Sequence, residues 1–155
     1  MIALTKKLVV LLEDNVDTLT KRAMEDIKKH GGTTTYRTLT DAQLYSRVAQ
    51  VYGQFDKWML GEIKKGSIKQ TFTAVGKRRR EEDFQVSEVI QALIIIRRHI
   101  WIYVDSENFF ETALDLRSAI DLINMTLVFF DWAIYFTTVG YEQSVMKVDP
   151  KLNPA

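Results

Sequence analysis

The side chains best suited to proton or ligand chemistry near neutral pH are two histidines, His30 and His99. His99 stands inside a long apolar segment, where a neutral imidazole could ligate haem iron, accept a phosphoryl group or form a hydrogen bond across an interface. His30 follows two lysines and precedes two glycines, which is typical of the last turn of a helix. A structural role accounts for both residues, and His99 stays open as a candidate haem ligand or phosphoacceptor.

Other patterns that would indicate catalysis or metal binding do not occur in the sequence. The spacings Glu-x-x-His and His-Glu-x-x-His are absent, so no helical metal site is expected. The seven glycines form neither a phosphate-binding loop nor a Gly-x-Ser-x-Gly turn. The lack of cysteine removes thiolate zinc sites, cysteine nucleophiles and iron–sulfur clusters. We therefore expect no catalytic residue, no metal, no bound cofactor and no enzyme activity.

A basic run at residues 77–80 is the densest positive cluster in the chain. Four neighbouring cations could bind phosphate groups, but Glu81, Glu82 and Asp83 follow at once and cancel most of that attraction. Over the whole chain, 21 lysines and arginines stand against 20 acidic residues, which leaves a net charge of +1. The run is therefore expected to be a self-neutralising helix end, and no nucleic-acid partner is expected.

Helices are expected to position these residues, because apolar residues recur at helical spacing and both prolines lie near the C-terminal end. The first helix is expected to contain residues 8–27 and to end at residues 28–30, just before Gly31 and Gly32. Residues 40–43 have the form of a capping box that opens a second helix, which is expected to reach Gly66. Further helices are expected at about residues 67–80, at 86–104, and from Ser106 or Phe109 to Ser144. The sequence thus predicts an all-α domain.

The last of these helices carries two apolar seams. The first steps by four and three residues, as in a heptad repeat, through Leu116, Ile120, Ile123, Leu127, Phe130, Ile134, Thr137 and Tyr141. The second lies on a neighbouring face and contains Leu122, Met125, Phe129, Trp132, Phe136 and Val139. One seam could pack on the domain while the other meets a second subunit, or both could lie inside a single bundle.

The length of 155 residues and the apolar content of 46% are sufficient for one domain, expected at residues 1–145 and followed by a tail or shortened linker at 146–155. No targeting segment is recognisable at the N-terminus. The two most apolar stretches, residues 89–104 and 119–139, are interrupted by charged side chains. Each such side chain costs roughly 2.5–3.5 kcal/mol at the centre of a membrane span. We therefore expect a cytoplasmic protein without a membrane partner.

Six short segments, taken in order, form a pattern typical of one known family: residues 36–41 (YRTLTD), 75–84 (VGKRRREEDF), 87–93 (SEVIQAL), 97–101 (RRHIW), 129–135 (FFDWAIY) and 140–142 (GYE). Over roughly residues 8–143 the chain resembles the N-terminal sensory domains of the RsbR type. These domains are input modules of bacterial stressosome proteins and of related sensor histidine kinases.

The resemblance implies a globin-like bundle of about five to six helices that binds no haem and forms a homodimer. Its long C-terminal helix would carry a signal through a shift between two packings, using Leu116, Ile120, Ile123, Leu127, Phe130, Ile134 and Tyr141. The output module of such a domain would be a STAS domain or a kinase domain. Because the residues after Gln143 resemble neither module, the output could instead be a separate signalling protein. The family supplies no catalytic residue.

A second hypothesis is a globin-like sensor that holds a ligand in its core, either haem bound by His99 or an acyl chain. The weaker possibility of a phosphotransfer bundle also depends on His99.

Overall fold

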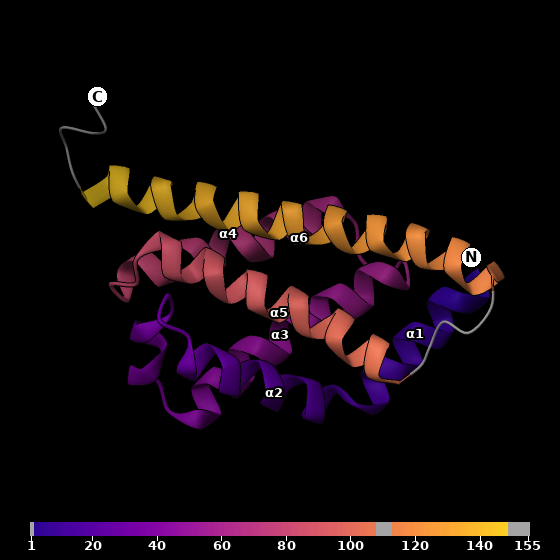
Figure 1. Cartoon of the computed structure of the whole chain (residues 1–155). Coiled ribbons are helices and arrows are strands. Elements are labelled where there is room, and N and C mark those ends of the chain that lie inside the picture. The colour runs from indigo at the N-terminus through magenta and orange to yellow at the C-terminus, as the bar shows by residue number, and fades with distance from the viewer. Residues whose placement is uncertain (1, 108–112, 149–155) are drawn as a thin grey trace.

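The computed structural model describes residues 2–107 and 113–148, and every regular element in this part is helical (Figure 1). The expected all-α class with a long C-terminal helix is therefore confirmed. Within the described residues there are six α-helices and one short 3-10 helix, η1: α1 (Ile2–Asp14), α2 (Val16–Lys29), η1 (Thr34–Thr38), α3 (Asp41–Met59), α4 (Lys65–Glu81), α5 (Val86–Ser106) and α6 (Ala113–Val148).

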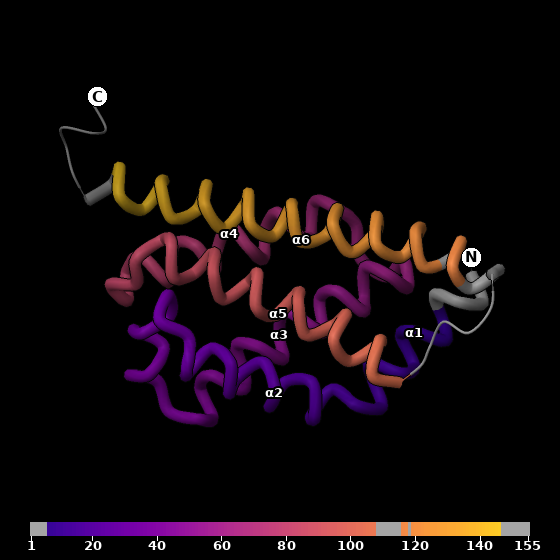
Figure 2. The backbone as a smooth tube through the Cα atoms, viewed as in Figure 1, coloured from indigo at the N-terminus to yellow at the C-terminus, as the bar shows by residue number. Residues whose placement is uncertain are grey.

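Helix α6 lies along one side of the molecule, where it packs mainly on α4 and also on α5, while α2 lies on the opposite side of α5 (Figures 1 and 2). The 36 residues of α6 span roughly 54 Å at 1.5 Å per residue. Helix α6 continues to Val148, past residue 146, where a tail or shortened linker is expected from the sequence. Residues 149–155 and Phe109 lie outside the described residues.

The prediction of one continuous first helix is wrong, because Asn15 divides this segment into α1 and α2. The backbone of Asn15 leaves the helical region, with φ −122° and ψ 16°. Its side-chain Nδ2 donates a hydrogen bond to the Leu11 carbonyl at 2.8 Å. A short amide side chain that bonds to nearby backbone competes with the helix ladder, which is the physical reason for the break.

The second helix begins as expected and ends earlier than expected. The Thr40 hydroxyl accepts from the Gln43 amide at 3.2 Å, and the Thr40 amide donates to the Gln43 side chain at 2.9 Å, so the capping box is confirmed. Helix α3 stops at Met59 because Gly61 adopts φ +76°, whereas Gly66 lies in the first turn of α4.

Aromatic side chains fill the core between α3, α4 and α6. Phe129 of α6 is fully buried, and its ring centroid lies 5.3 Å from Phe55 and 5.9 Å from Phe72. Trp58 packs against Phe129 at 5.8 Å and against Trp132 at 5.7 Å. The second apolar seam of α6 is therefore the one that faces the core.

Helices α4 and α6 touch through their backbones at two glycines. A Cβ atom added to Gly76 would lie 2.0 Å from the Thr137 carbonyl oxygen, and one added to Gly140 would lie 2.0 Å from that of Thr73. Real Cβ atoms do not approach oxygen this closely. The C-terminal half of α6 is thus fixed against α4 by a contact that only glycine permits.

Candidate functional site

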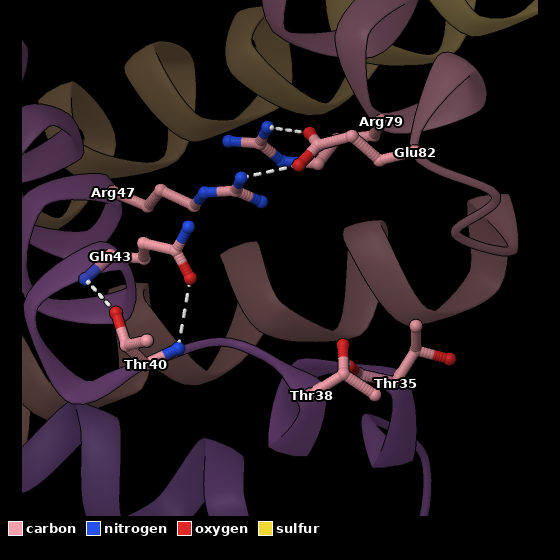
Figure 3. A network of polar contacts seen from close by, with 7 residues as sticks. All are labelled: Thr35, Thr38, Thr40, Gln43, Arg47, Arg79 and Glu82. Carbon is pink, nitrogen blue, oxygen red and sulfur yellow. Dashed lines mark hydrogen bonds and ion pairs between the residues drawn. The ribbon is translucent and has the colours of Figure 1, made fainter.

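A partly buried ion-pair cluster joins α3 to the C-terminal end of α4. Arg79 follows Phe72 and Val75 on the inward face of α4 and is only 6% exposed. Its Nη1 lies 2.8 Å from Oε1 of Glu82, the residue that caps α4. Arg47 of α3 reaches the other oxygen of the same carboxylate, so Glu82 lies between two guanidinium groups (Figure 3). We call these three residues the Arg47–Arg79–Glu82 cluster.

The cluster has more positive charge than its carboxylate neutralises. Burial, together with the charge of Arg47, lowers the pKa of Arg79. Burial opposes ionisation of Glu82, but hydrogen bonds and charges from Arg47 and Arg79 outweigh it and lower the pKa of this carboxyl. The Arg47 Nη1 is fully buried and has no hydrogen-bond partner. A second anion at this point would satisfy that nitrogen and compensate the excess charge.

A small cavity lies directly inside the cluster. It holds about 30 Å³, close to the volume of one water molecule. Its polar groups come chiefly from Tyr36, Arg47, Gln50 and Arg79, and the rest of its wall is apolar: Ile27, Leu44, Val48, Val51, Phe72, Val75, Val89, Ala92, Leu93 and Ile96. On the outer side, a groove of about 570 Å³ shares Arg47, Gln50 and Arg79 with the cavity. The arginines therefore separate an apolar interior from a polar groove.

The 3-10 helix η1 closes another side of this cavity by carrying Tyr36. Glu88 of α5 holds η1 in place: it accepts hydrogen bonds from the Thr35 amide at 2.8 Å, the Thr35 hydroxyl at 2.6 Å and the Thr34 hydroxyl at 3.2 Å. Burial raises the pKa of Tyr36 to about 12, so its phenol stays protonated and can donate a hydrogen bond at neutral pH.

The two histidines lie away from the cavity. His99 Nε2 is 2.8 Å from Asp26 Oδ2, and His99 Nδ1 is buried without a hydrogen-bond partner. His99 does not line the cavity, and one of its ring nitrogens is already engaged, so the residues present do not fit a haem ligated by His99. His30 caps α2, and its Nδ1 accepts from the Gly32 amide at 2.9 Å.

The heptad seam of α6 does not form one continuous surface. Its N-terminal members are exposed, from 63% at Leu116 to 41% at Ile123, whereas Phe130 is fully buried and belongs to the core. Ile134 packs against the core, and Tyr141 is half-buried. Together with α5, the exposed members form an apolar surface that we call the α5–α6 face, composed of Trp101, Ile102, Leu116, Ile120, Ile123 and Leu127.

The α5–α6 face is hollowed between its two helices by a groove of about 450 Å³, lined by Trp101, Ile102, Asp105, Ala119 and Ile123. Helix α6 also contains, within Ala119–Met146, a stretch long and apolar enough to cross a membrane, and 39% of its most apolar window is buried inside the structure. A core helix of a soluble protein meets the same criteria of length and composition.

Sequence reasoning found the α6 residues but missed the Arg47–Arg79–Glu82 cluster. Residues 77–80 were expected to be a self-neutralising helix end with no role in a site. The spacing from Phe72 and Val75 to Arg79 is the helical signal that turns this arginine inward. Arg47 has no comparable signal, because only the approach of α3 to α4 makes it part of the site.

No protein-family model matches the chain, and no curated protein sequence matches it significantly. The RsbR-type resemblance therefore stays a prediction. Among residues 2–107 and 113–148, no group of three or more histidines and carboxylates could hold a metal ion.

A buried carboxyl outside the cluster gives a pH-dependent prediction. Asp56 of α3 is buried, its Oδ1 has no hydrogen-bond partner, and burial together with the charge of Glu13 raises its pKa to about 7. Because this pKa exceeds the ordinary aspartate value of 3.8, the folded state binds the proton more tightly than the unfolded state does. The contribution of the protonated Asp56 carboxyl to the free energy of unfolding is therefore fully present below about pH 4 and is lost as the pH rises through 7.

We expect Asp56→Asn to be more stable than the unmodified chain at pH 8, by roughly 1–3 kcal/mol, because the amide removes a buried charge. The difference should shrink toward pH 4. Denaturant unfolding across this range measures it, with Asp105→Asn at an exposed position as control. Parallel stability curves for Asp56→Asn and the unmodified chain would contradict the raised pKa.

Proposed function

We propose that this chain is a non-catalytic sensory or regulatory module of a bacterial cytoplasmic signalling system, and that it acts as a homodimer. The observation that carries the proposal is the α5–α6 face, where large apolar side chains of two neighbouring helices are exposed around one groove. Contiguous exposed apolar surfaces of this kind mark interaction sites in soluble proteins. The RsbR-type resemblance supports the same function.

A second copy of the chain is the partner that best suits this surface. In a two-fold dimer the same patch occurs on both sides, so α5 and α6 of each subunit would pack together as a four-helix arrangement. The face is bordered by both signs of charge, with exposed Arg98 on α5 and exposed Asp121 on α6. Asp121 and Asp131 on the outer side of α6 oppose burial in lipid, which favours the cytoplasmic location.

In this proposal α6 has two roles along its length. Its N-terminal half contacts the second subunit, and its C-terminal half is bound to α4 within the subunit. A change in packing at either end can rotate or shift a rigid helix of this length. A STAS domain, a kinase domain or a separate signalling protein would receive that movement.

Replacing both Ile120 and Leu127 by Asp is expected to convert the dimer into a folded monomer, because both side chains are exposed within one subunit. Multi-angle light scattering at tens of micromolar measures the mass. Leu60→Asp is the matched control, since Leu60 is exposed on another surface and should leave the dimer intact. A strict monomer of the unmodified chain would contradict the proposal. Ile134 is unsuitable for this test because it packs against the core.

A second candidate function is the binding of an amphipathic carboxylic acid at the Arg47–Arg79–Glu82 cluster. The unpaired Nη1 of Arg47 and the excess positive charge favour a carboxylate, and the apolar cavity behind the arginines favours an alkyl chain. Because the cavity has the volume of about one water molecule, a longer chain can enter only if the surrounding helices separate.

Titration with sodium decanoate, followed by isothermal calorimetry, tests this candidate. We expect binding that Arg47→Gln weakens at least tenfold, the effect of losing a charge-assisted hydrogen bond of about 1.4 kcal/mol or more. Arg78→Gln is the control, because Arg78 lies on the same groove but is exposed and makes no contact with the cavity. Equal affinities of the two variants would remove the cluster as the carboxylate site.

A further inference from the structure

We propose that the corner between α4 and α5, residues 82–85, is a switch through which the Arg47–Arg79–Glu82 cluster controls the attachment of the last turns of α6. This inference rests on the proposed function, in which α6 carries the signal. It gives the corner a regulatory role that goes beyond the roles proposed for the Arg47–Arg79–Glu82 cluster and for the α5–α6 face.

On the cluster side, the corner is tied to the two arginines by Glu82. This residue both caps α4 and supplies the only carboxylate that, among the described residues, pairs with Arg47 and Arg79. The next residue, Asp83, has φ +63°, a left-handed conformation that Asp tolerates better than most residues with a side chain. The Phe84 amide donates to the Arg79 carbonyl at 3.0 Å, which closes the corner. The corner is thus a compact helix end whose cap residue, Glu82, is bound to both arginines.

On the α6 side, Phe84 is the point of attachment. Its ring is buried and lies edge-on to Tyr36 at 4.6 Å, with the Arg47 guanidinium 5.9 Å from its centre. Its carbonyl oxygen accepts a hydrogen bond of 2.6 Å from the hydroxyl of Tyr141. One residue therefore touches the cavity wall through Tyr36, the cluster through Arg47, and α6 through Tyr141.

The place of Tyr141 along α6 determines what the switch would control. Gly140 fixes α6 against the α4 backbone, and Tyr141 is the first residue beyond that fixed point. An anion that displaced Glu82 from the guanidinium groups would release the corner from the arginines and allow it to rearrange. Movement of the Phe84 carbonyl would then break the bond to Tyr141, so residues 141–148 would lose an anchor while the rest of α6 stayed in place.

Hydrogen exchange of the backbone amides of residues 141–148, measured by NMR on the full chain, tests the switch without any ligand. Glu82→Gln weakens the ion pairs and is expected to accelerate exchange at least fivefold in this segment, whereas the exposed neighbour Glu81→Gln should leave it within twofold of the unmodified chain. Arg47→Gln removes one ion pair without altering the corner and should accelerate exchange in the same direction.

Tyr141→Phe supplies the decisive comparison, because it removes only the hydroxyl that bonds to Phe84. We expect it to accelerate exchange as Glu82→Gln does, and we expect Glu82→Gln to add less than twofold in the Tyr141→Phe background. Unchanged exchange in Glu82→Gln, or effects that multiply fully in the double variant, would overturn the switch. A monomeric unmodified chain would instead contradict the proposed function and would leave these ratios unaffected, so the two failures are distinguishable.

Discussion

Gly140→Ala is expected to destabilise the protein by about 3 kcal/mol, at the upper end of the range for overpacking a tight contact. The added Cβ would lie 2.0 Å from the Thr73 carbonyl oxygen and 2.8 Å from its carbon, so it meets backbone that cannot rotate away. Helices α4 and α6 would have to separate, which would also loosen the side chains packed around them. For a chain of this size the loss corresponds to a fall in Tm of roughly 6–12 °C.

Gly53→Ala is the matched control for this prediction. Gly53 lies inside α3, and a Cβ atom added there meets nothing within 4 Å. Alanine is a better helix former than glycine by up to about 1 kcal/mol, so this variant should be slightly more stable than the unmodified chain. Thermal and denaturant unfolding of both variants measure the difference. A Gly140→Ala variant as stable as Gly53→Ala would show that α4 and α6 do not meet at these glycines.

Phe129→Ala is expected to cost about 3–5 kcal/mol, the largest loss from any single truncation in the core. The ring is fully buried and has four aromatic neighbours within 6 Å, at Phe55, Trp58, Phe72 and Phe130. Truncation removes apolar area and also leaves a cavity that these rigid rings cannot readily fill. Because Phe129 lies on α6 where it packs against α3 and α4, the loss should also loosen the middle of α6.

The adjacent residue provides the control. Val128 is exposed on the same turn of α6, so Val128→Ala is expected to change the free energy of unfolding by less than about 1 kcal/mol within one subunit. Urea unfolding of both variants below the concentration at which they associate separates core packing from subunit contacts. Similar losses in the two variants would mean that α6 presents a different face to the core.

Helix α6 is divided into two parts with different surroundings, and the proposed function depends on this division. The C-terminal part is anchored by a glycine contact, an aromatic core and the hydrogen bond from the Tyr141 hydroxyl to the Phe84 carbonyl. The N-terminal part presents Leu116 and Ile120 to solvent. A helix fixed at one end and exposed at the other can transmit a change in packing along its length.

The sequence by itself determined the elements whose causes are local. Apolar spacing located α3 to α6, because a helix repeats its faces every 3.6 residues whatever surrounds it. The capping box at Thr40 and Gln43 was predictable for the same reason, since both partners lie within one turn. The local rule failed at Asn15, where a competing side-chain hydrogen bond divides a pattern that is apolar on both sides of the break.

Only the tertiary structure decided how those elements are used. Spacing could show that α6 has two apolar seams, but not that one seam is exposed at Leu116 and buried at Phe130. It could show a basic run, but not that Arg79 meets Arg47 over a shared carboxylate beside a cavity. Both outcomes depend on which helices approach one another, and the close approach of α4 and α6 at Gly76 and Gly140 involves residues 64 positions apart that no local pattern links.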